Sequence, residues 1–420
     1  MDLKKHFQNK KITVMGLGLL GRGVGDAEFL AELGAELIVT DLKKEEELTS
    51  SVERLKKCTN ITYRLGEHRL EDFKDRDFIL KAAGVPLDSP YIAEAKKNGI
   101  PIKMSASWFA ELAGIPLVGI TGTRGKTTVT YLLRDMMEAS GMQVLLGGNV
   151  RGVSTLALLR SAPKESIGLF ELDSWQLQGF GDSRVSPHIA VFTTLYPDHL
   201  NYYKNDTDTY LKDKAQVFLH QKTGDVLVLG AQAKSAVLGA YTPPVAPTIA
   251  DTALVEGWEM HIPGEHNRYN AACAVAAAQA LGIDEEVCRK ALAEFKGVPG
   301  RLELVREVNG VKFYNDTTAT TPEATLAALR ALDHNDGRPT SIIVVMGGAD
   351  KGLDMSALMA EVPNRTKKVF LLAGTGTDRI AEHLSNTMIY HSIAEALSDA
   401  LAASESGDTI LFSPAFASFG

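Results

Sequence analysis

Cysteine is scarce in this sequence, with three among 420 residues: Cys58, Cys273 and Cys288. The number is odd, and the cysteines show neither a CxxC pair nor the Cys/His spacing of a zinc site, which argues against a disulfide framework and against structural zinc. No apolar run reaches the roughly 18 residues of a transmembrane helix. The first residues, MDLKKHFQNKKITVMG, lack the apolar core of a signal peptide. These absences predict a cytoplasmic protein with no membrane insertion.

The sequence also has no strong excess of charge of one sign. Lys and Arg number 44 and Asp and Glu 52, so the formal net charge is −8. A mildly acidic chain has no overall attraction for nucleic acid, and we expect no nucleic-acid partner. The hydrophobic fraction of 45% excludes extensive intrinsic disorder. At roughly 150 residues per domain, the length predicts about three domains.

Short strand patterns alternate with helical patterns along the whole chain. Residues 11–15 (KITVM), 117–120 (LVGI) and 168–172 (GLFEL) are examples of the strands, and residues 189–195 (IAVFTTL) are another. Such alternation is typical of an α/β protein with mostly parallel sheets and helices on both faces. Near the C-terminus, Asn309-Gly310 between two apolar runs predicts a type I′ hairpin. We therefore expect three consecutive α/β domains, at residues 1–104, 105–297 and 298–420.

The first motif with chemical meaning is Gly16-x-Gly18-x-x-Gly21, which follows the first strand. Glycines let the backbone approach a diphosphate, and the following helix N-terminus supplies partial positive charge. Asp41, at the end of the next strand, would accept a ribose hydroxyl, as in NAD-binding folds. The alternative is a tight turn without a ligand, and the motif leaves open which diphosphate is bound.

The second motif lies between a strand and a helix. It consists of Gly122, Thr123, Arg124, Gly125, Lys126, Thr127 and Thr128. Backbone N–H groups would surround phosphates, Lys126 would contact the outer ones, and the Thr127 hydroxyl would face Mg²⁺. The loop lacks the first glycine of the strict GxxxxGK[ST] pattern, and a purely structural loop is the alternative. Two diphosphate sites in one chain favour an enzyme that uses ATP to activate a nucleotide-linked substrate.

A series of motifs over essentially the whole chain resembles the Mur ligases, which add amino acids to the peptidoglycan precursor. The motifs are GLGLLG, GTRGKTT, GGN, ELDSWQL, PDHLNYY, GEHNRYNAA, GRLE, NDTTAT, GGADKG and SPAFAS. The resemblance implies a central P-loop-type ATPase domain between two Rossmann-like domains, an N-terminal one for the UDP substrate and a C-terminal one for the amino acid. The first and last motifs favour the branch that joins D-glutamate to UDP-N-acetylmuramoyl-L-alanine. We expect a monomer.

The resemblance also implies the site residues. The catalytic residues would be Lys126, Glu171, His199 and Lys214. Two Mg²⁺ would be held by Thr127, Glu171, His199 and a carbamylated Lys214. ATP would contact the loop at 122–128 together with Asn267, Asn270, Arg301 and Asp316. The UDP substrate would contact Gly18, Leu19, Leu20, Gly21, Asp41, Leu42, Lys43, Asn149, Ser174, Gln176 and His199. The amino acid would contact Thr320, Lys351 and Ser418. Taken singly, Glu171 is also consistent with a solvated strand end, His199 with a structural histidine and Lys214 with a surface lysine.

The sequence departs from the family pattern at several positions. They are Thr318 in place of a lysine, Asp173 in place of a serine, Leu20 in place of a threonine, Leu42-Lys43 in place of Thr-Arg, and an end at Phe419-Gly420 before an aromatic and basic tail. Three alternatives therefore stay open. They are a Mur-type ligase for another amino acid, a nucleotide-binding homologue without activity, and an NAD-dependent oxidoreductase. The last leaves the 122–128 loop unexplained.

Overall fold

The computed structural model describes residues 2–18, 21–86, 88–150, 152–333, 340–384 and 387–417, without the side chains of Leu200 and Asn201. Leu19, Leu20 and Ser418 of the predicted site lie outside the described residues. The chain forms two compact units. Unit 1 consists of Met1–Leu254 and Ala272–Cys288, and unit 2 of Val255–Ala271 and Arg289–Gly420. Among the described residues, no helix has both the length and the apolar character needed to cross a membrane.

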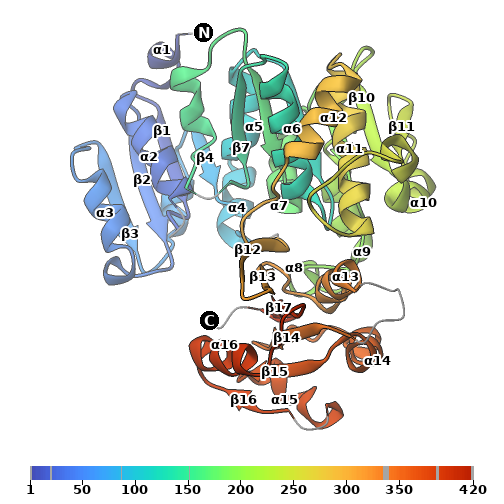
Figure 1. Cartoon of the computed structure of the whole chain (residues 1–420). Coiled ribbons are helices and arrows are strands. Elements are labelled where there is room, and N and C mark those ends of the chain that lie inside the picture. Colours follow the sequence, from blue (N-terminus) through green and yellow to red (C-terminus); the bar gives the residue numbers. More distant parts are fainter. Residues whose placement is uncertain are drawn as a thin grey trace. The chain divides into compact units, whose positions relative to one another are not determined.

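The first sheet of unit 1 is parallel, with strand order β3-β2-β1-β4-β5 (Figure 1). Its strands are β1 (Lys11–Met15), β2 (Glu36–Asp41), β3 (Ile61–Leu65), β4 (Phe78–Lys81) and β5 (Ile102–Lys103). Its helices are α1 (Leu3–Phe7), α2 (Arg22–Glu32), α3 (Thr49–Leu55) and α4 (Pro90–Lys97). The chain continues from β1 to β2 on one side and later places β4 on the other. The carboxyl ends of β1 and β4 therefore mark the switch point, where open α/β sheets bind ligands.

The second sheet of unit 1 is also parallel, with order β11-β10-β9-β6-β8-β7. Its strands are β6 (Leu117–Thr121), β7 (Val144–Gly148), β8 (Ile167–Glu171), β9 (Ile189–Phe192), β10 (Val226–Gly230) and β11 (Pro247–Ala250). The helices are α5 (Ser105–Leu112), α6 (Lys126–Ala139), α7 (Ser174–Ser183), α8 (Leu200–Tyr203), α9 (Thr207–Ala215) and α10 (Ala231–Ala240). Two further helices, α11 (Glu265–Ala280) and α12 (Glu285–Glu294), each have residues in both units. Because β6 lies between β8 and β9, the loop after β6 has Glu171 on one side and Thr193 on the other.

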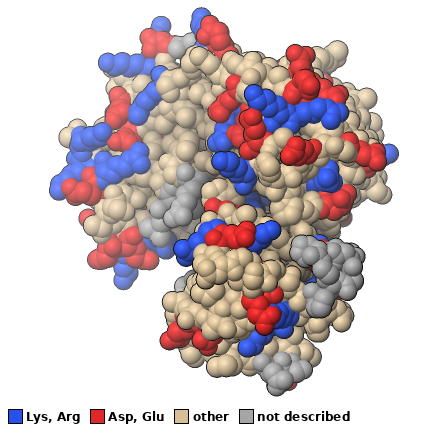
Figure 2. Space-filling view, in the orientation of Figure 1, with Lys and Arg blue, Asp and Glu red and all other residues tan. Residues whose placement is uncertain are grey.

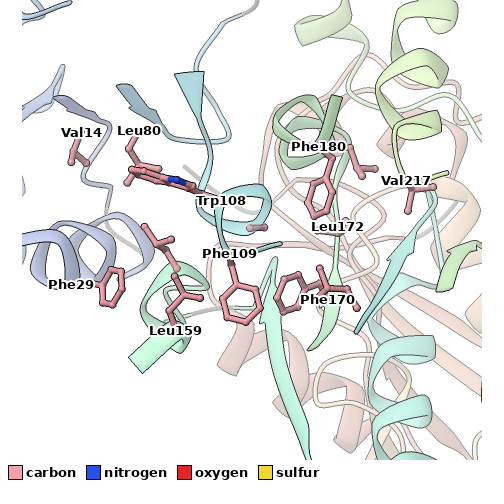
Figure 3. Close-up of a cluster of buried hydrophobic side chains, with 14 of the residues drawn as sticks. Val14, Phe29, Leu80, Trp108, Phe109, Leu159, Phe170, Leu172, Phe180 and Val217 are labelled. Atoms are coloured by element: carbon pink, nitrogen blue, oxygen red, sulfur yellow. The ribbon is translucent and has the colours of Figure 1, made fainter. Parts of the chain in front are cut away.

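Helix α5 joins the cores of these two sheets. Trp108 and Phe109 are adjacent in sequence, both are buried, and both belong to one hydrophobic cluster that spans the two sheets. Figure 3 shows Trp108 beside Leu80 of β4, whereas Phe109 faces Phe170 of β8. The Phe109 and Phe170 rings meet edge to face, with their centroids 5.2 Å apart. Burial of large aromatic groups on both sides of one short helix explains why the two sheets form a single compact unit.

Unit 2 contains the third sheet, with order β12-β13-β17-β14-β15-β16. Its strands are β12 (Glu303–Val308), β13 (Val311–Asn315), β14 (Ile342–Met346), β15 (Lys368–Leu372), β16 (Ile389–Tyr390) and β17 (Thr409–Phe412). Its helices are α13 (Pro322–Leu332), α14 (Ser356–Arg365), α15 (Thr375–Asp378) and α16 (Ile393–Ala402). β12 and β13 are antiparallel, and the other strand pairs of this sheet are parallel. Asn309 and Gly310 both have positive φ, 52° and 80°, which confirms the predicted type I′ hairpin.

The described surface carries interspersed charges of both signs, as the visible face of unit 1 illustrates (Figure 2). Many are ion pairs, such as Lys57, whose Nζ lies 3.0 Å from Glu28 Oε1 and 3.3 Å from Glu32 Oε1. Exposed pairs of this kind contribute little to stability, about 1 kcal/mol or less each. The fold is therefore held by the buried clusters rather than by these charges.

Candidate active site

The loop after β6 is fastened to the segment that follows β9. Gly122 has φ of 142°, and a Cβ atom there would lie 2.0 Å from Thr193 Oγ1, so only glycine fits. Thr123 N donates to Thr194 O at 2.7 Å, and Arg124 N donates to Thr194 Oγ1 at 2.8 Å. These bonds explain a difference from the sequence prediction, in which the strand continued to residue 195. It ends at Phe192: Thr193 N still donates to Thr121 O, at the end of β6, at 2.8 Å, whereas Thr194 bonds the loop instead of a neighbouring strand.

Two lysines converge on one carbonyl of this loop. Lys126 Nζ donates to Gly122 O at 3.0 Å and to Thr123 O at 3.2 Å. Lys214 Nζ, brought by α9, donates to the same Gly122 O at 2.9 Å and lies 4.8 Å from the centre of the Tyr210 ring. Lys214 is only 2% exposed, so it is not a surface lysine. Burial, followed by repulsion from Lys126, lowers the pKa of Lys214 well below its usual value, which favours a neutral, nucleophilic amine.

Glu171 and His199 flank the loop region with different partners. Glu171 is the last residue of β8 and is buried, and its Oε1 accepts a long hydrogen bond of 3.4 Å from Asn149 Nδ2. His199 has φ of 54°, an uncommon left-handed conformation for a residue with a side chain, and its ring lies 4.7 Å from that of Trp175. Burial lowers the pKa of His199, which favours the neutral imidazole that ligates metals.

The described residues contain no group of three or more His, Cys, Asp or Glu side chains close enough to hold a metal ion. A magnesium ion beside this loop would therefore need oxygen ligands of other kinds. The Thr127 hydroxyl, phosphate oxygens and a carbamate on Lys214 are hard oxygen donors of the type that Mg²⁺ prefers.

A cavity of about 230 Å³ opens at the switch point of the first sheet. It is lined by Val14, Gly16, Leu17, Gly18, Arg22, Gly23, Asp26, Leu80, Lys81, Ala82, Ala83, Gly84, Met104, Ser105, Ala106 and Gln176. Of the residues predicted to contact the UDP substrate, Gly18 and Gln176 are among those that line this cavity. Gly21 has φ of 81° and is the N-cap of α2, directly before the lining residue Arg22.

Asp41 bonds the glycine-rich turn itself. Its Oδ2 accepts from Leu17 N at 2.9 Å and from Gly18 N at 3.1 Å, and its Oδ1 accepts from Lys43 N at 2.9 Å. The sequence predicted that this carboxylate accepts a ribose hydroxyl. In the structure both of its oxygens bond the backbone, and the adjacent Leu42 is 66% exposed.

Asp173 begins helix α7. Its carboxylate accepts from Gln176 N at 2.8 Å, and Gln176 Oε1 accepts from Asp173 N at 3.3 Å, which together form a capping box. The departure from serine therefore preserves a helix cap, since aspartate and serine are both favoured N-cap residues. Ser174, also predicted to contact the UDP substrate, is the buried first residue of this helix.

In unit 2, Asp316 lies at the end of β13 in a buried polar network. Its Oδ1 accepts from Leu302 N at 3.0 Å and its Oδ2 from Ser413 Oγ at 2.9 Å. Burial raises the pKa of Asp316 to about 6, opposed by the Ser413 hydrogen bond and by the charge of Arg301. Thr318 Oγ1 donates to Gly300 O at 3.0 Å, so the threonine that replaces a lysine fastens the GRLE turn.

Two other predicted pairs lie together in unit 2. Lys351 Nζ donates to Thr320 Oγ1 at 3.1 Å, which joins two of the residues expected to hold the amino acid. Asn270 Nδ2 donates to Asn267 Oδ1 at 3.2 Å near the start of α11, and both side chains are buried.

Three charged residues of the cavity were missed by the sequence reasoning. They are Arg22, Asp26 and Lys81. Lys81 ends β4, just as Glu171 ends β8, so its place at the carboxyl end of a strand beside the switch point was an available signal. Arg22 follows Gly21 of the glycine-rich motif directly, so its position in the sequence could also have indicated a residue of this site. Asp26 lies within α2 and gave no sequence signal, because only folding brings Ser105 and Ser154 to its carboxylate.

Comparison with known proteins defines the class. Residues 10–104 match the MurD-like N-terminal domain of Mur ligases, residues 120–243 the Mur ligase middle domain, and residues 300–416 the Mur ligase glutamate ligase domain. The chain belongs to the Mur ligase family and has its three-domain α/β fold.

Its curated relatives include two bacterial proteins named UDP-N-acetylmuramoylalanine–D-glutamate ligase. That of Roseiflexus sp. (strain RS-1) is 34% identical, over 98% of this chain and 95% of the relative. That of Borreliella burgdorferi (strain ZS7) is also 34% identical, over 99% and 95%. Among solved structures, the UDP-N-acetylmuramate-alanine ligase MurC of Thermotoga maritima shares the fold, with a TM-score of 0.61 at 21% identity over 97% of this chain and 96% of that one.

Proposed function

We propose that this protein is an ATP-dependent ligase that joins D-glutamate to UDP-N-acetylmuramoyl-L-alanine in peptidoglycan precursor synthesis. The observation with the most weight is the 34% identity, over nearly the full length of both chains, to relatives named for this activity. The proposal assigns the UDP substrate to residues 1–104, ATP to residues 105–297 and the amino acid to residues 298–420.

The phosphate loop supports the assignment of ATP. Lys126 and Lys214 place two positively charged or protonatable nitrogens on one side of Gly122, in a turn that a Cβ atom would obstruct. Such a turn suits a polyphosphate, since the close backbone and the Lys126 ammonium both favour anionic oxygens. Bound Mg²⁺, at the proposed ligands Thr127, Glu171 and His199, would neutralise phosphate charge and orient the reacting groups.

Lys214 is proposed to carry a carbamate. Its neutral amine would attack CO₂, forming an N–C bond and releasing one proton, and the product would be an anion with two oxygens. The low pKa of the Lys214 amine supports this step, because the unprotonated form is the nucleophile. The change also removes the repulsion between two ammonium groups that share Gly122 O as their acceptor.

In the proposed reaction, the carboxylate of the UDP substrate attacks the γ-phosphorus of ATP, and ADP leaves. The amine of D-glutamate then attacks the acyl carbon of the resulting acyl phosphate and loses a proton, and inorganic phosphate leaves as the amide forms. The chain's own contribution is positioning and charge neutralisation, with Lys126 at the phosphates and the Lys351–Thr320 pair at the amino acid.

The test is ADP release from Mg²⁺-ATP in the presence of UDP-N-acetylmuramoyl-L-alanine and single amino acids, including D-glutamate and L-glutamate. We expect release only when the UDP substrate and D-glutamate are both present. Release with another amino acid would replace the proposed specificity, and silence from a chain that still binds ATP would refute the proposed activity.

A further inference from the structure

Two cationic residues from different parts of the first domain's sheet and helices line the cavity at the switch point. Arg22 begins α2 directly after the glycine-rich turn, and Lys81 ends β4. Arg22 Nη1 donates to Asn149 Oδ1 at 2.8 Å, and Lys81 Nζ donates to Gln178 Oε1 at 2.7 Å. Each cation is therefore bonded to the neutral oxygen of an amide side chain.

The positive charge of Lys81 is poorly compensated in the described part of the chain. Lys81 is 7% exposed, and no carboxylate there lies within ion-pair distance of it. Asp182 and Asp213 act on it only from farther away, and burial lowers the pKa of Lys81. A buried cation without a counter-charge is energetically unfavourable, and an anionic ligand in the adjacent cavity would offset this cost.

Asp26 is the acidic residue among those lining the cavity, and its Oδ1 is bonded by two serine hydroxyls, Ser105 Oγ at 2.8 Å and Ser154 Oγ at 2.5 Å. The charge of Arg22 lowers the pKa of Asp26, but less than burial raises it. Asp26 therefore only partly balances the two cations, and the charge balance of the lining favours an anion.

The glycine-rich turn cannot supply all the donors that an anion here would need. The N–H groups of Leu17 and Gly18 already bond Asp41 Oδ2. Oxygens of a phosphate group in this cavity would therefore gain from side-chain donors beside the backbone N–H groups at the start of α2. Arg22 and Lys81 are the cationic ones in the lining, and a guanidinium is well suited to phosphate because it offers several N–H groups in a fixed plane.

We propose that Arg22 and Lys81 form a cationic clamp for the diphosphate of a nucleoside-diphosphate ligand. The inference rests on the proposed function, in which that ligand is the UDP-linked substrate. It adds these two side chains to the glycine-rich turn and the helix N-terminus, from which the sequence predicted recognition of the diphosphate. The cavity volume of about 230 Å³ is below the roughly 300 Å³ at which sites for whole drug-sized ligands begin. It fits a fragment such as the diphosphate, with the rest of the ligand outside.

A purely structural role for Lys81 is the competing explanation. Gln178 also donates through Nε2 to Asp213 Oδ2 at 2.8 Å, so Lys81 could instead fasten a network that leads to α9. In that case loss of Lys81 would lower the melting temperature and weaken all ligands alike. A clamp would instead lose affinity only for the phosphate part of a ligand, so UDP and uridine distinguish the two.

The experiment measures UDP binding to the full chain by calorimetry and uridine binding by ligand-observed NMR. The variants are Arg22→Gln and Lys81→Met, with Arg22→Lys and Lys81→Arg to keep the charge. Lys164→Met removes an exposed lysine outside the cavity and is the matched control. Loss of a hydrogen bond to a charged group predicts about tenfold or more weaker UDP binding in the first two variants. We expect unchanged uridine binding, smaller losses in the charge-keeping variants and no loss in the control.

UDP affinity within about twofold of wild type in both Arg22→Gln and Lys81→Met would overturn the clamp, because a lost charged hydrogen bond is worth more. Equal losses of UDP and uridine together with a lower melting temperature would overturn it in favour of a structural role. If the wild-type chain releases ADP as proposed while these variants keep UDP affinity, only the clamp fails. If the wild-type chain neither binds UDP nor releases ADP, the clamp and the proposed function both fail.

Discussion

Replacing Asp26 with asparagine is expected to change how the stability of unit 1 depends on pH. Asp26 is 5% exposed, and Ser105 and Ser154 both donate to its Oδ1. Burial outweighs these hydrogen bonds and the charge of Arg22, and raises the pKa of Asp26 from 3.8 to about 6. The folded chain therefore holds this proton more tightly than the unfolded chain does.

The direction and size of the effect follow from that difference. A group whose pKa is raised by folding gives stability that is fully present below its unfolded pKa, here 3.8, and is lost as the pH rises through about 6. A shift of about two units corresponds to about 3 kcal/mol. Asparagine has no such titration. The free energy of unfolding of Asp26→Asn, relative to wild type, should therefore rise by about 2 to 3 kcal/mol between about pH 4 and pH 7.

The assay is urea unfolding followed by tryptophan fluorescence and by circular dichroism at several pH values. Trp108 and Trp175 report on unit 1, and Asp75→Asn, which removes a carboxylate that is 89% exposed, is the matched control. A difference between Asp26→Asn and wild type that stays constant within about 0.5 kcal/mol over this range would refute the reasoning, because it would mean that Asp26 titrates alike in the folded and unfolded chains.

Three further predictions test other parts of unit 1. Lys214→Ala should abolish ADP release while short-chain carboxylates partly restore it, and wild-type turnover in this variant would contradict the proposed carbamate. Trp108→Ala should lower the free energy of unfolding by about 3 to 5 kcal/mol, the usual cost of removing a buried aromatic ring; denaturant titration measures it, and a loss below about 1 kcal/mol would contradict the joining role of α5. Asp173→Ala should cost about 1 kcal/mol in the same titration through loss of the α7 cap, whereas Asp173→Ser should retain most of it. Equal losses in both Asp173 variants would show that the cap is not the cause.

The sequence by itself determined the local elements and their order. The α/β alternation, the strand that ends at Glu171 and the hairpin at Asn309-Gly310 all follow from preferences within a few residues. Hydrophobic periodicity and the positive φ that a type I′ turn requires are local properties, which explains why these predictions are confirmed. The order of the family motifs likewise sufficed to indicate the Mur ligase fold.

Tertiary structure alone decided which atoms meet. Lys214 and Gly122 are 92 positions apart, so no local pattern shows that the lysine is buried against the loop carbonyl that Lys126 also contacts. The same holds for Asp41, whose carboxylate bonds the turn 23 and 24 positions before it. Dihedral preferences are set by neighbours in the chain, but burial, hydrogen-bond partners and the resulting pKa shifts are set by neighbours in space, and those exist only once the sheets have packed.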